Sequence, residues 1–591
     1  MKELHEQIVR DVLPLVRNPA QYIGGEINLV RKHHDAVALK FALAFPDTYG
    51  VGMSHLGLQV LYHMLNSRPD VACERAFAPW PDMIAELRWR AIPLCSLESF
   101  TPLAQFDVVG FTLQHEMTYT NLLLMLDLAH IPLLAANRTR NHPLVIAGGP
   151  GALTPEPLAD FIDLFYVGEA ENSLHVLIDR LIELKRLPDR REILHQVAAS
   201  VPSVYVPSLY QVEYEGPRQV SFTPRFKDIP ETIDAAVCED FENAPCPTAP
   251  LVPLTETVHD RIALEIMRGC PHGCRFCQAG MTRKPVRIRS VDRLVELAQA
   301  TYRNTGHDEI SLMSLSSNDY PHLEDLLKKM HRKFTPLNVN LSVPSLHVSP
   351  NLVGLPEVLA AVRKSGLTFA PEAATTELRA IIGKPITDDD LLRGIFEAYQ
   401  CGWNLVKLYF MTGLPGETEA DRKAVADLAL RASHIRRQLN EGPGAVNVAL
   451  AWFVPKPHTP FQWEPMADRE VLRRTRTDLS ERLRRTRVTI RFHNIARSCL
   501  EAAIGRGDRR FGAVILHAYD LGAIFDDWDE HFKEEHWLEA FSRAHLKALD
   551  FSHRRRDDDE MLPWQHIRTF RSADYLIHQR DEARRLIAQR T

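Results

Sequence analysis

The sequence predicts an α/β protein with an N-terminal doubly wound, Rossmann-like domain, a partial or full (β/α) barrel and a helical C-terminal region. Short apolar runs alternate with helical patterns through residues 38–200 and again through 261–457, and such alternation indicates βαβ units around parallel sheets. Strand patterns end near residue 466. Because a chain of 591 residues is too long for one hydrophobic core, we expect several domains.

The first alternation contains four predicted buried strands, with helix-like segments at 53–67 and 117–131 between them. The strands are expected at 38–46, 106–114, 143–151 and 164–171. Three of them run into loops rich in Gly, Pro or polar residues, and this carboxyl edge is where open α/β sheets bind ligands. Together with an N-terminal amphipathic helix, we assign this domain to residues 1–200.

The rest of the chain divides into three predicted parts. Residues 201–255 are Pro-rich and form a connector, and 256–465 form the barrel, whose function belongs at the C-terminal edge of its strands. Residues 466–591 are expected to be helical. The barrel strands are predicted at 261–269, 309–317, 338–346, 367–373, 404–416 and 447–457.

Composition narrows the class of protein. Hydrophobic residues make up 45% and charged residues 25%, as in soluble globular proteins. No apolar run approaches the roughly 20 residues that span a bilayer, and the N-terminus lacks the apolar core of a signal peptide. We therefore expect a cytoplasmic protein without a membrane partner. The net charge of -6 gives no global attraction to nucleic acid.

Three of the nine cysteines, Cys270, Cys274 and Cys277, lie in "EIMRGCPHGCRFCQAG" directly after an apolar strand. One tight cluster in an odd total indicates reduced metal ligands rather than a disulfide framework. Structural zinc usually takes four protein ligands in two pairs, and no second cysteine pair lies nearby. An iron–sulfur cubane bound by three thiolates leaves one iron open for a ligand. A surface cysteine cluster or an atypical zinc knuckle is the alternative.

A strand followed by C-x3-C-x2-C, with Phe276 before the last cysteine, resembles the signature of radical S-adenosylmethionine (radical SAM) enzymes. The resemblance implies a [4Fe–4S] cluster on the three cysteines, whose open iron holds the amino and carboxylate groups of SAM. One-electron reduction by a donor such as flavodoxin or ferredoxin then gives a 5′-deoxyadenosyl radical. The same resemblance makes Phe276 a candidate for the SAM site.

Later segments match the superfamily in the right order. The segment "SLMSLSS" ends the second strand, where the superfamily contacts the aminocarboxylate of SAM, so Ser314 and Ser316 are candidates. "FAPEAATTELR" puts Glu372 at the barrel mouth, where a carboxylate can bind an ammonium or ribose hydroxyl; Ala374 stands where related enzymes usually have glycine. In "LVKLYFMTGLPGET", Lys407 is either a buried polar anchor or a rim residue.

A doubly wound sheet before such a barrel resembles the cobalamin-binding arrangement, and the matching stretches are 45–62, 107–121, 146–158 and 166–171. Glycine there lets backbone approach a flat macrocycle or its nucleotide tail. The Asp-x-His-x-x-Gly motif is absent, since His55 lacks the aspartate, and His115 could approach a corrin or be structural. A vestigial sheet that binds nothing is the alternative. The cobalamin candidates are Gln114, His115, Gly148, Gly149, Gly168 and Glu169.

The C-terminal region adds a more specific resemblance. Residues 491–532 and 562–567 resemble the tail of a largely uncharacterised branch of radical SAM proteins with a cobalamin-binding domain. The arginine-rich run at 469–487 could contact RNA phosphates, although interleaved acidic residues favour a solvated helix with local ion pairs.

We therefore expect a cobalamin-dependent radical SAM enzyme of the methyltransferase type. It would methylate or rearrange an unactivated carbon of a small-molecule or RNA substrate. Two alternatives stay open at this point: an RNA-modifying enzyme similar to methylthiotransferases, and a non-catalytic sensor that depends on cobalamin or the cluster.

Overall fold

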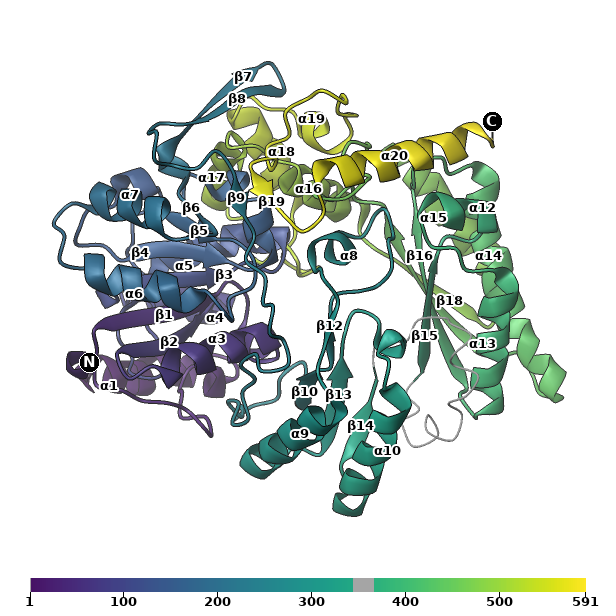
Figure 1. Ribbon diagram of the computed structural model, residues 1–591, viewed down its shortest axis with the longest axis horizontal. Coiled ribbons are helices and arrows are strands. Elements are labelled where there is room, and N and C mark those ends of the chain that lie inside the picture. Colours follow the sequence, from purple (N-terminus) through teal and green to yellow (C-terminus); the bar gives the residue numbers. More distant parts are fainter. Residues whose placement is uncertain (1, 344–365, 591) are drawn as a thin grey trace.

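A computed structural model describes residues 2–343 and 366–590. It confirms the predicted fold class: a Rossmann-like sheet, a parallel barrel-type sheet and a helical C-terminal region follow one another along the chain (Figure 1). Of the predicted strand at 338–346, the residues from 344 onward lie outside the described part of the chain. The assigned domain boundaries stay predictions.

The N-terminal sheet has six strands in the order β2-β1-β3-β4-β5-β6, all parallel except β6, which is antiparallel to β5. Its central strands are almost continuously apolar, as expected for strands covered on both faces. The strands are β1 (Leu39–Phe45), β2 (Val71–Phe77), β3 (Val108–Thr112), β4 (Leu144–Gly148), β5 (Leu164–Tyr166) and β6 (Val204–Tyr205).

Helices connect these strands on both sides of the sheet. Strand β1 lies between β2 and β3. The connection from β1 to β2 therefore runs to one side of β1, and the next connection takes the chain to β3 on the other side. The carboxyl edge between β1 and β3 is thus a topological switch point. Ligands of doubly wound sheets bind there. The helices are α2 (Tyr49–Met53), α3 (Leu56–Ser67), α4 (Pro81–Trp89), α5 (Tyr119–Leu128), α6 (Leu174–Leu184) and α7 (Arg190–Ser200), and α1 (Lys2–Gln7) precedes the sheet.

Strand β2 was not predicted, because its sequence VACERAF interrupts the apolar pattern with two charges. The Arg75 side chain is fully buried and forms ion pairs with Glu26 at 2.8 Å and Glu98 at 2.6 Å. Glu74 accepts a hydrogen bond from Ser96 at 2.5 Å. A buried charge is tolerated in a strand when partners of this kind compensate it, and those partners are distant in the sequence.

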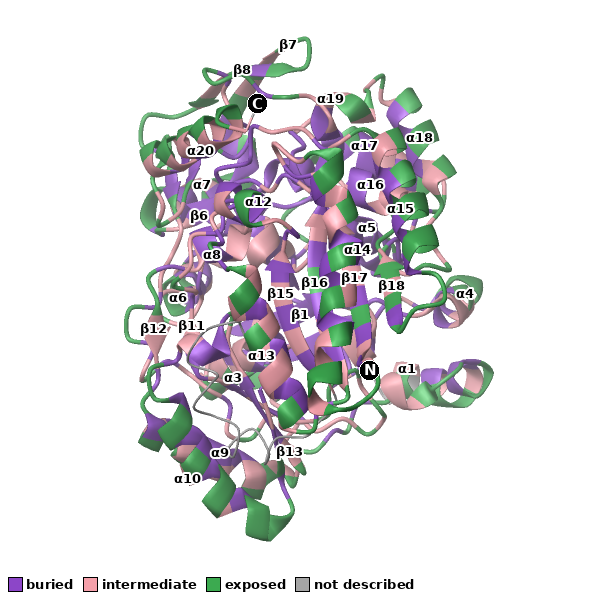
Figure 2. Cartoon of the chain, turned by 90° about the vertical axis from the view of Figure 1, so that its right-hand side faces the viewer, coloured by how far each residue is buried: buried purple, intermediate pink, exposed green. Residues whose placement is uncertain are grey.

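The barrel consists of two parallel sheets, β10-β13-β14 and β15-β16-β17-β18. Its strands are mostly buried, whereas the outer faces of α9 and α10 are exposed (Figure 2). The strands are β10 (Ile262–Glu265), β13 (Glu309–Met313), β14 (Asn340–Ser342), β15 (Leu367–Glu372), β16 (Leu405–Thr412), β17 (Ala445–Trp452) and β18 (Val488–Phe492). The helices are α8 (Gln278–Thr282), α9 (Val291–Thr305), α10 (Leu323–Phe334), α12 (Thr376–Ile381), α13 (Asp388–Gln400), α14 (Glu419–His434) and α15 (Arg469–Leu483).

Strand β18 corrects the expectation that strands end near residue 466. It pairs in parallel with β17 from Val446↔Val488 to Leu450↔Phe492, so the four-stranded sheet continues beyond the assigned barrel. The strand is short and directly follows the arginine-rich run, and its two exposed residues, Thr489 and Arg491, weaken its apolar pattern. Pairing with β17, rather than local sequence, determines this strand.

The C-terminal helices join both domains. Side chains of α16 and α17 belong to the same apolar core as the N-terminal sheet, whereas α20 packs against α12 of the barrel and crosses its upper edge in Figure 1. These helices are α16 (Ile495–Gly505), α17 (Phe511–Asp520), α18 (Glu534–Arg543), α19 (Ala548–Ser552) and α20 (Ala573–Ala588). Short strands complete the fold: β7 (Tyr210–Glu215), β8 (Arg218–Pro224), β9 (Ile233–Asp234), β11 (Met267–Arg268), β12 (Arg287–Ile288) and β19 (Ile567–Arg568).

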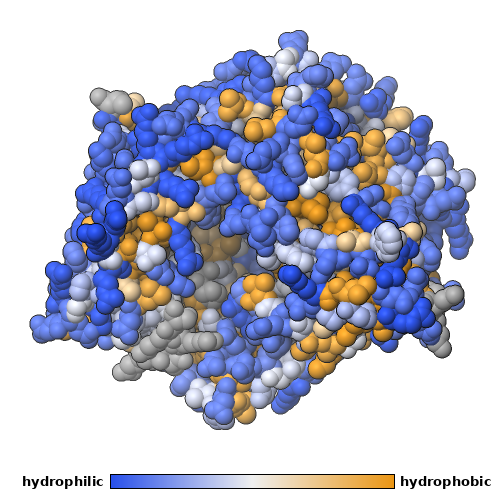
Figure 3. Space-filling model, turned by 180° about the vertical axis from the view of Figure 1, so that it is seen from behind, coloured by the Kyte–Doolittle hydropathy of each residue, from blue (hydrophilic) through white to orange (hydrophobic). Residues whose placement is uncertain are grey.

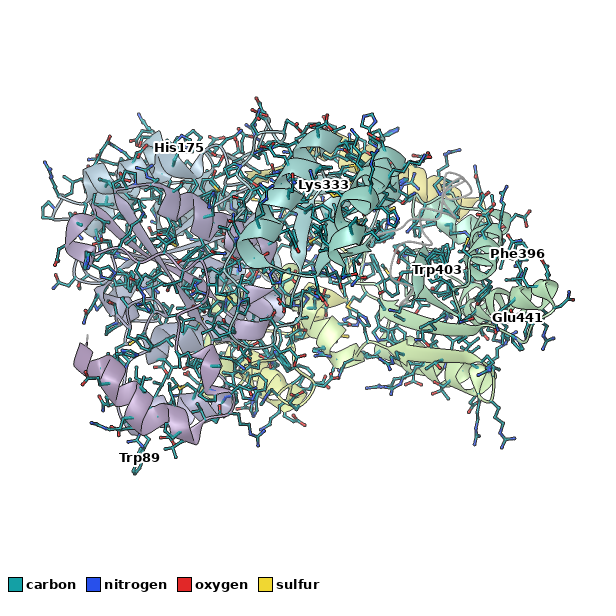
Figure 4. The ribbon with its side chains drawn as sticks, turned by 90° about the horizontal axis from the view of Figure 1, so that it is seen from below. Trp89, His175, Lys333, Phe396, Trp403 and Glu441 are labelled. Carbon is teal, nitrogen blue, oxygen red and sulfur yellow. The ribbon has the colours of Figure 1, made fainter. Side chains whose placement is uncertain are left out.

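The surface is mainly hydrophilic, with small hydrophobic areas between polar side chains (Figure 3). Trp89, at the end of α4, is 83% exposed and projects outward from the N-terminal domain (Figure 4). Among the described residues, no helix combines the length and apolarity needed to cross a bilayer.

Candidate functional site

The three clustered cysteines lie on the loop that leaves β11 and enters α8. The loop begins at Gly269, whose φ of +90° and close approach to Arg283 exclude a side chain, because a Cβ would lie 2.4 Å from the Arg283 carbonyl oxygen. It ends at Cys277, which caps α8 by accepting a hydrogen bond from the Gly280 N–H at 3.3 Å. The loop therefore has a fixed entrance and exit.

The cysteine side chains are close enough to influence one another; Cys274 is buried, and Cys270 and Cys277 are half-buried. Burial raises the pKa of all three thiols, and that of Cys274 rises to about 12. The nearby Cys277 raises the pKa of Cys270 and Cys274 further. A bound metal would be needed to hold such thiols as thiolates. The three thiols therefore remain candidate metal ligands.

The three sulfurs can be compared with the geometry of a single ion. A tetrahedral zinc with 2.3 Å bonds would draw its sulfur ligands to about 3.8 Å from one another. Among the described residues, two groups of three have ligand atoms that all lie within 4.8 Å, and the three cysteines are not one of these groups. A wider spacing suits a multi-iron cluster, in which each thiolate binds a different iron.

Arg275 fixes the middle of this loop from inside the protein. It is 4% exposed, and its guanidinium donates to the carbonyls of Ala380 and Ile381 at 3.0 and 2.8 Å, at the end of α12. It also forms an ion pair with Glu582 of α20 at 2.8 Å. The C-terminal helix therefore helps to hold the cysteine loop, although it lies three hundred residues further along the chain.

Glu372 lies at the carboxyl end of β15, close to the cysteines. Burial raises its pKa, and Lys384, whose Nζ lies 3.4 Å from Oε1, opposes this effect. The same two groups act on Cys274 and Cys277 electrostatically. The backbone of Glu372 has a φ of +67°; Ala374, where a glycine was expected from the resemblance, is not among the described residues with positive φ.

The predicted serines differ in availability. Ser314 lines a cavity at the end of β13, whereas Ser316 is 1% exposed and donates to Asp319 at 2.5 Å. Asp319 in turn lies 2.8 Å from His272, between Cys270 and Cys274. Ser316 therefore supports the cysteine loop through this carboxylate, and Ser314 is the one exposed to a ligand.

Lys407 and Phe276 have separate locations. Lys407 pairs with Thr368 near the beginning of β15, and its Cε lies 3.3 Å from the position of a Cβ on Gly366. It is therefore at the opposite end of the strand from Glu372, and the structure does not bring it to the cysteines. Phe276 lies on the cysteine loop and packs against an apolar cluster that includes Phe453 and Leu414.

A cavity of about 510 Å³ separates the Rossmann-like sheet from the cysteine loop. It begins at the carboxyl ends of β3, β4 and β5 and continues over the sheet beneath α3, where Phe41, Val60 and Leu65 make it apolar. Glu265, Arg268 and Gly269 of the barrel close its other side. We call it the sheet cavity.

Five of the six cobalamin candidates line the sheet cavity: Gln114, Gly148, Gly149, Gly168 and Glu169. His115 is separated from them and lines a different cavity, where its Nε2 lies 3.9 Å from both Glu116 and Glu501. Because the backbone is still extended at His115, with φ -148° and ψ 144°, the adjacent side chains of Gln114 and His115 point to different sides. His55 lines the sheet cavity instead.

His55 caps α3, because its Nδ1 accepts the Leu58 N–H at 3.2 Å. Burial lowers its pKa, so the ring is neutral at pH 7, with the proton on Nε2. The sequence offered one signal for it: a histidine at a helix start just beyond β1, a strand that borders the switch point.

Glu169 and Gly168 are occupied by contacts within the protein. The Glu169 carboxylate binds Arg287 at 2.6 and 2.9 Å and accepts the Cys238 N–H at 2.8 Å, so it joins the N-terminal domain to the barrel. A Cβ on Gly168 would lie 2.3 Å from the Ala236 nitrogen, which shows that the connector requires glycine there.

The two compact groups that resemble metal sites already contain cations. Arg268 lies 3.4 Å from Glu169 and 2.6 Å from Glu171, the acidic members of one group. In the other, Lys456 Nζ lies 2.7 Å from Glu116 and 2.9 Å from Glu501. A metal ion would have to displace these cations, so we assign both groups to electrostatic contacts between elements.

We expect Glu417, in the Gly-Leu-Pro-Gly-Glu loop, to give stability a pH dependence. Burial raises its pKa to about 7, although it accepts the Gly413 N–H at 2.7 Å. A raised carboxyl pKa stabilises the fold below the unfolded pKa of 4.5, and this contribution is lost as pH rises through about 7. Its magnitude is up to about 3 kcal/mol.

The variant Glu417→Gln should therefore have a smaller stability loss between pH 5 and pH 8 than the wild type. Thermal unfolding at both pH values measures this difference. If the difference in unfolding temperature between variant and wild type is the same at both pH values, Glu417 is not the source of the pH dependence.

The described geometry can be compared with known proteins. A family model described as "Radical SAM proteins, N-terminal" matches residues 57–207, and one described as "Radical SAM superfamily" matches residues 264–429. A relative, the uncharacterized protein MJ0966 of Methanocaldococcus jannaschii, is 25% identical over 479 residues, covering 80% of this chain and 90% of that protein.

Two solved structures are similar at low identity. The radical SAM methyltransferase TsrM of Kitasatospora setae, with cobalamin and a [4Fe–4S] cluster bound, has a TM-score of 0.46 and 15% identity, covering 70% of this chain and 72% of its own. The cobalamin-dependent SAM radical enzyme OxsB, with aqua-cobalamin bound, has a TM-score of 0.48 and 12% identity, covering 93% and 80%.

Proposed function

We propose that this chain, which belongs to the radical SAM superfamily, uses Cys270, Cys274 and Cys277 to bind a [4Fe–4S] cluster on which S-adenosylmethionine is cleaved. The observation that carries this proposal is the three thiols on one anchored loop, in the spacing C-x3-C-x2-C and with no disulfide partner. When bound, the cluster supplies one electron that splits SAM into methionine and a 5′-deoxyadenosyl radical. The electron comes from a reduced donor of the flavodoxin or ferredoxin class.

The protein's own residues would position SAM and exclude water. Glu372 offers a carboxylate at the barrel mouth for the ammonium or ribose of SAM. The Lys384 ammonium, 3.4 Å away, partly offsets the negative charge of this carboxylate. Ser314, whose hydroxyl also contacts the Ser317 hydroxyl at 3.0 Å, would meet the aminocarboxylate from the side of the sheet cavity. Phe276, packed on its apolar cluster, would shield the cluster from solvent. Lys407, near the beginning of β16, is too far from the barrel mouth for this role.

We propose in addition that the sheet cavity binds cobalamin. Its mouth is made of glycine backbone at Gly148 and Gly149, and its apolar part beneath α3 would accommodate a nucleotide tail. His55 and Gln114 are the polar side chains that would contact the ligand from the N-terminal domain. Bound there, cobalamin would supply a methyl group to a carbon radical of the substrate. Methylation at an unactivated carbon is therefore the reaction that we favour.

Anaerobic reconstitution of the full-length protein tests the core of this proposal. We expect about four iron atoms per chain, an EPR signal of the reduced cluster that changes when SAM is added, and release of 5′-deoxyadenosine. An EPR signal that SAM leaves unaltered, together with no 5′-deoxyadenosine under reducing conditions, would contradict it.

Cobalamin binding has a separate test in Gly148→Leu. A Cβ on Gly148 would contact only the Tyr166 carbonyl oxygen, at 3.5 Å, so the larger side chain can extend into the sheet cavity. We expect cobalamin, followed by corrin absorbance, to bind roughly tenfold more weakly or not at all, a loss of at least about 1.4 kcal/mol.

The matched control is Gly442→Leu, because a Cβ on Gly442 has no neighbour within 4 Å and the residue is remote from the cavity. Iron content reports whether both variants fold. Equal corrin binding by wild type, Gly148→Leu and Gly442→Leu would remove cobalamin from this cavity.

A further inference from the structure

A second and larger cavity, of about 1030 Å³, lies beyond the carboxyl ends of β16, β17 and β18. Met411, Trp452 and Phe492 form its floor, and Phe276 of the cysteine loop forms one end. Helix α15 packs against both β18 and α16 at its side. We call it the arginine cavity, because Arg469, Arg473, Arg476 and Arg497 line it.

Most cations of this cavity already have partners. Arg469 binds Glu534 at 2.5 Å and Arg497 binds Asp529 at 2.6 Å. Lys456 lies between Glu116 and Glu501. These ion pairs hold α15, α16 and the N-terminal domain around the cavity, and they leave little net charge for a ligand.

Arg473 and Arg476 differ from the other two arginines. The nearest carboxylate oxygen to Arg473 belongs to Glu470, at 4.0 Å, and Arg474 binds the same carboxylate at 3.0 Å. Within the described residues, Arg476 contacts the ring of Phe492, 5.9 Å from its centroid, in place of a carboxylate. Three positions apart on one helix, both guanidiniums face the cavity. A guanidinium is suited to bind carboxylate or phosphate through two hydrogen bonds.

We propose that the arginine cavity binds an anionic group of the substrate, a carboxylate or a phosphate, through Arg473 and Arg476. The substrate then extends along the floor toward Met411 and Phe276, the end nearest the cysteines. This inference rests on the proposed function, since it assigns a substrate class to the same barrel mouth.

The charge of the cavity favours one anionic group over a nucleic acid. Its lining contains five lysine and arginine side chains and four carboxylates, Glu501, Asp527, Asp529 and Glu534. A nucleic acid would bring several phosphates against these acids, and its binding needs many uncompensated cations. Two adjacent guanidiniums, one 4.0 Å from Glu470 and the other against the ring of Phe492, instead match a single carboxylate or phosphate.

Calorimetric titration of the reconstituted full-length protein with inorganic pyrophosphate and with citrate tests the inference. In Arg473→Gln/Arg476→Gln we expect at least tenfold weaker binding of the preferred anion. The control Arg474→Gln, on the same helix but outside the cavity lining and 75% exposed in its side chain, should bind within twofold of wild type. Whichever probe binds more tightly identifies the phosphate or the carboxylate as the substrate's group.

Equal affinities in wild type and the double variant would overturn the inference. So would tighter binding of a single-stranded RNA than of either probe with a steep salt dependence, because that result indicates a polyanionic substrate. Wild-type protein from the same preparation is assayed for 5′-deoxyadenosine. No release contradicts the proposed function, whereas the anion titration decides this inference independently.

Discussion

Replacing Cys270, Cys274 and Cys277 together by alanine is expected to remove the iron and to abolish 5′-deoxyadenosine release. The three thiols are the ligands that a cubane would take from this loop, and iron–sulfur clusters are bound through thiolates. We expect the iron content to fall from about four atoms per chain to near zero. Iron analysis and the visible absorbance of the reconstituted protein measure it.

A matched control separates this effect from a general loss of thiols. Cys95, Cys246 and Cys401 have the same intermediate exposure as Cys270 and Cys277, and none lies on the cysteine loop. Their triple replacement by alanine should leave iron content and the EPR response to SAM close to wild type. Retention of iron by the first variant, or its loss in the control, would show that the cluster is bound elsewhere.

The sequence predicted those parts of the fold that local apolar patterns encode. Strands β1, β3, β4 and β5, and the barrel strands from β10 to β17, follow runs that are apolar because both faces are covered. Strands β2 and β18 escaped prediction for different reasons: two charges, Glu74 and Arg75, interrupt the apolar run of β2, whereas β18 is short and directly follows the arginine-rich run. For Arg75, partners far along the chain make burial possible, and no window of local sequence contains them.

The candidate site shows the same division. The cysteines and Glu372 could be predicted because spacing and strand ends are local features. Lys407 could not be excluded locally, because its position depends on where β16 begins and ends against β15. His115 is separated from Gln114 because the backbone stays extended beyond β3, so the two adjacent side chains enter different cavities. Arg275 gave no signal at all, since its partners lie on α12 and α20.

After the triple cysteine variant, Arg275→Ala is expected to cause the largest loss of bound iron. The cluster should be retained less well although all three cysteines are present. The guanidinium joins the cysteine loop to two carbonyls of α12 and to Glu582 of α20. Without it the Ile381 carbonyl remains buried without this donor, which costs about 1–3 kcal/mol, whereas the Ala380 carbonyl still accepts the Gly383 N–H at 3.1 Å. The loop also loses its link to the C-terminal helix. We expect iron content to fall by at least half, and faster loss of iron to a chelator.

The conservative variant Arg275→Lys distinguishes positioning from charge. Lysine keeps the positive charge near Glu582 but cannot donate to both carbonyls and the carboxylate from one planar group, so it should retain an intermediate iron content. The control is Arg585→Ala, an exposed position on α20, the helix of Glu582. Its iron content and rate of iron loss should match wild type. If Arg275→Ala unfolds at a lower temperature but releases iron at the wild-type rate, Arg275 supports the fold alone, and α20 has no part in holding the cysteine loop.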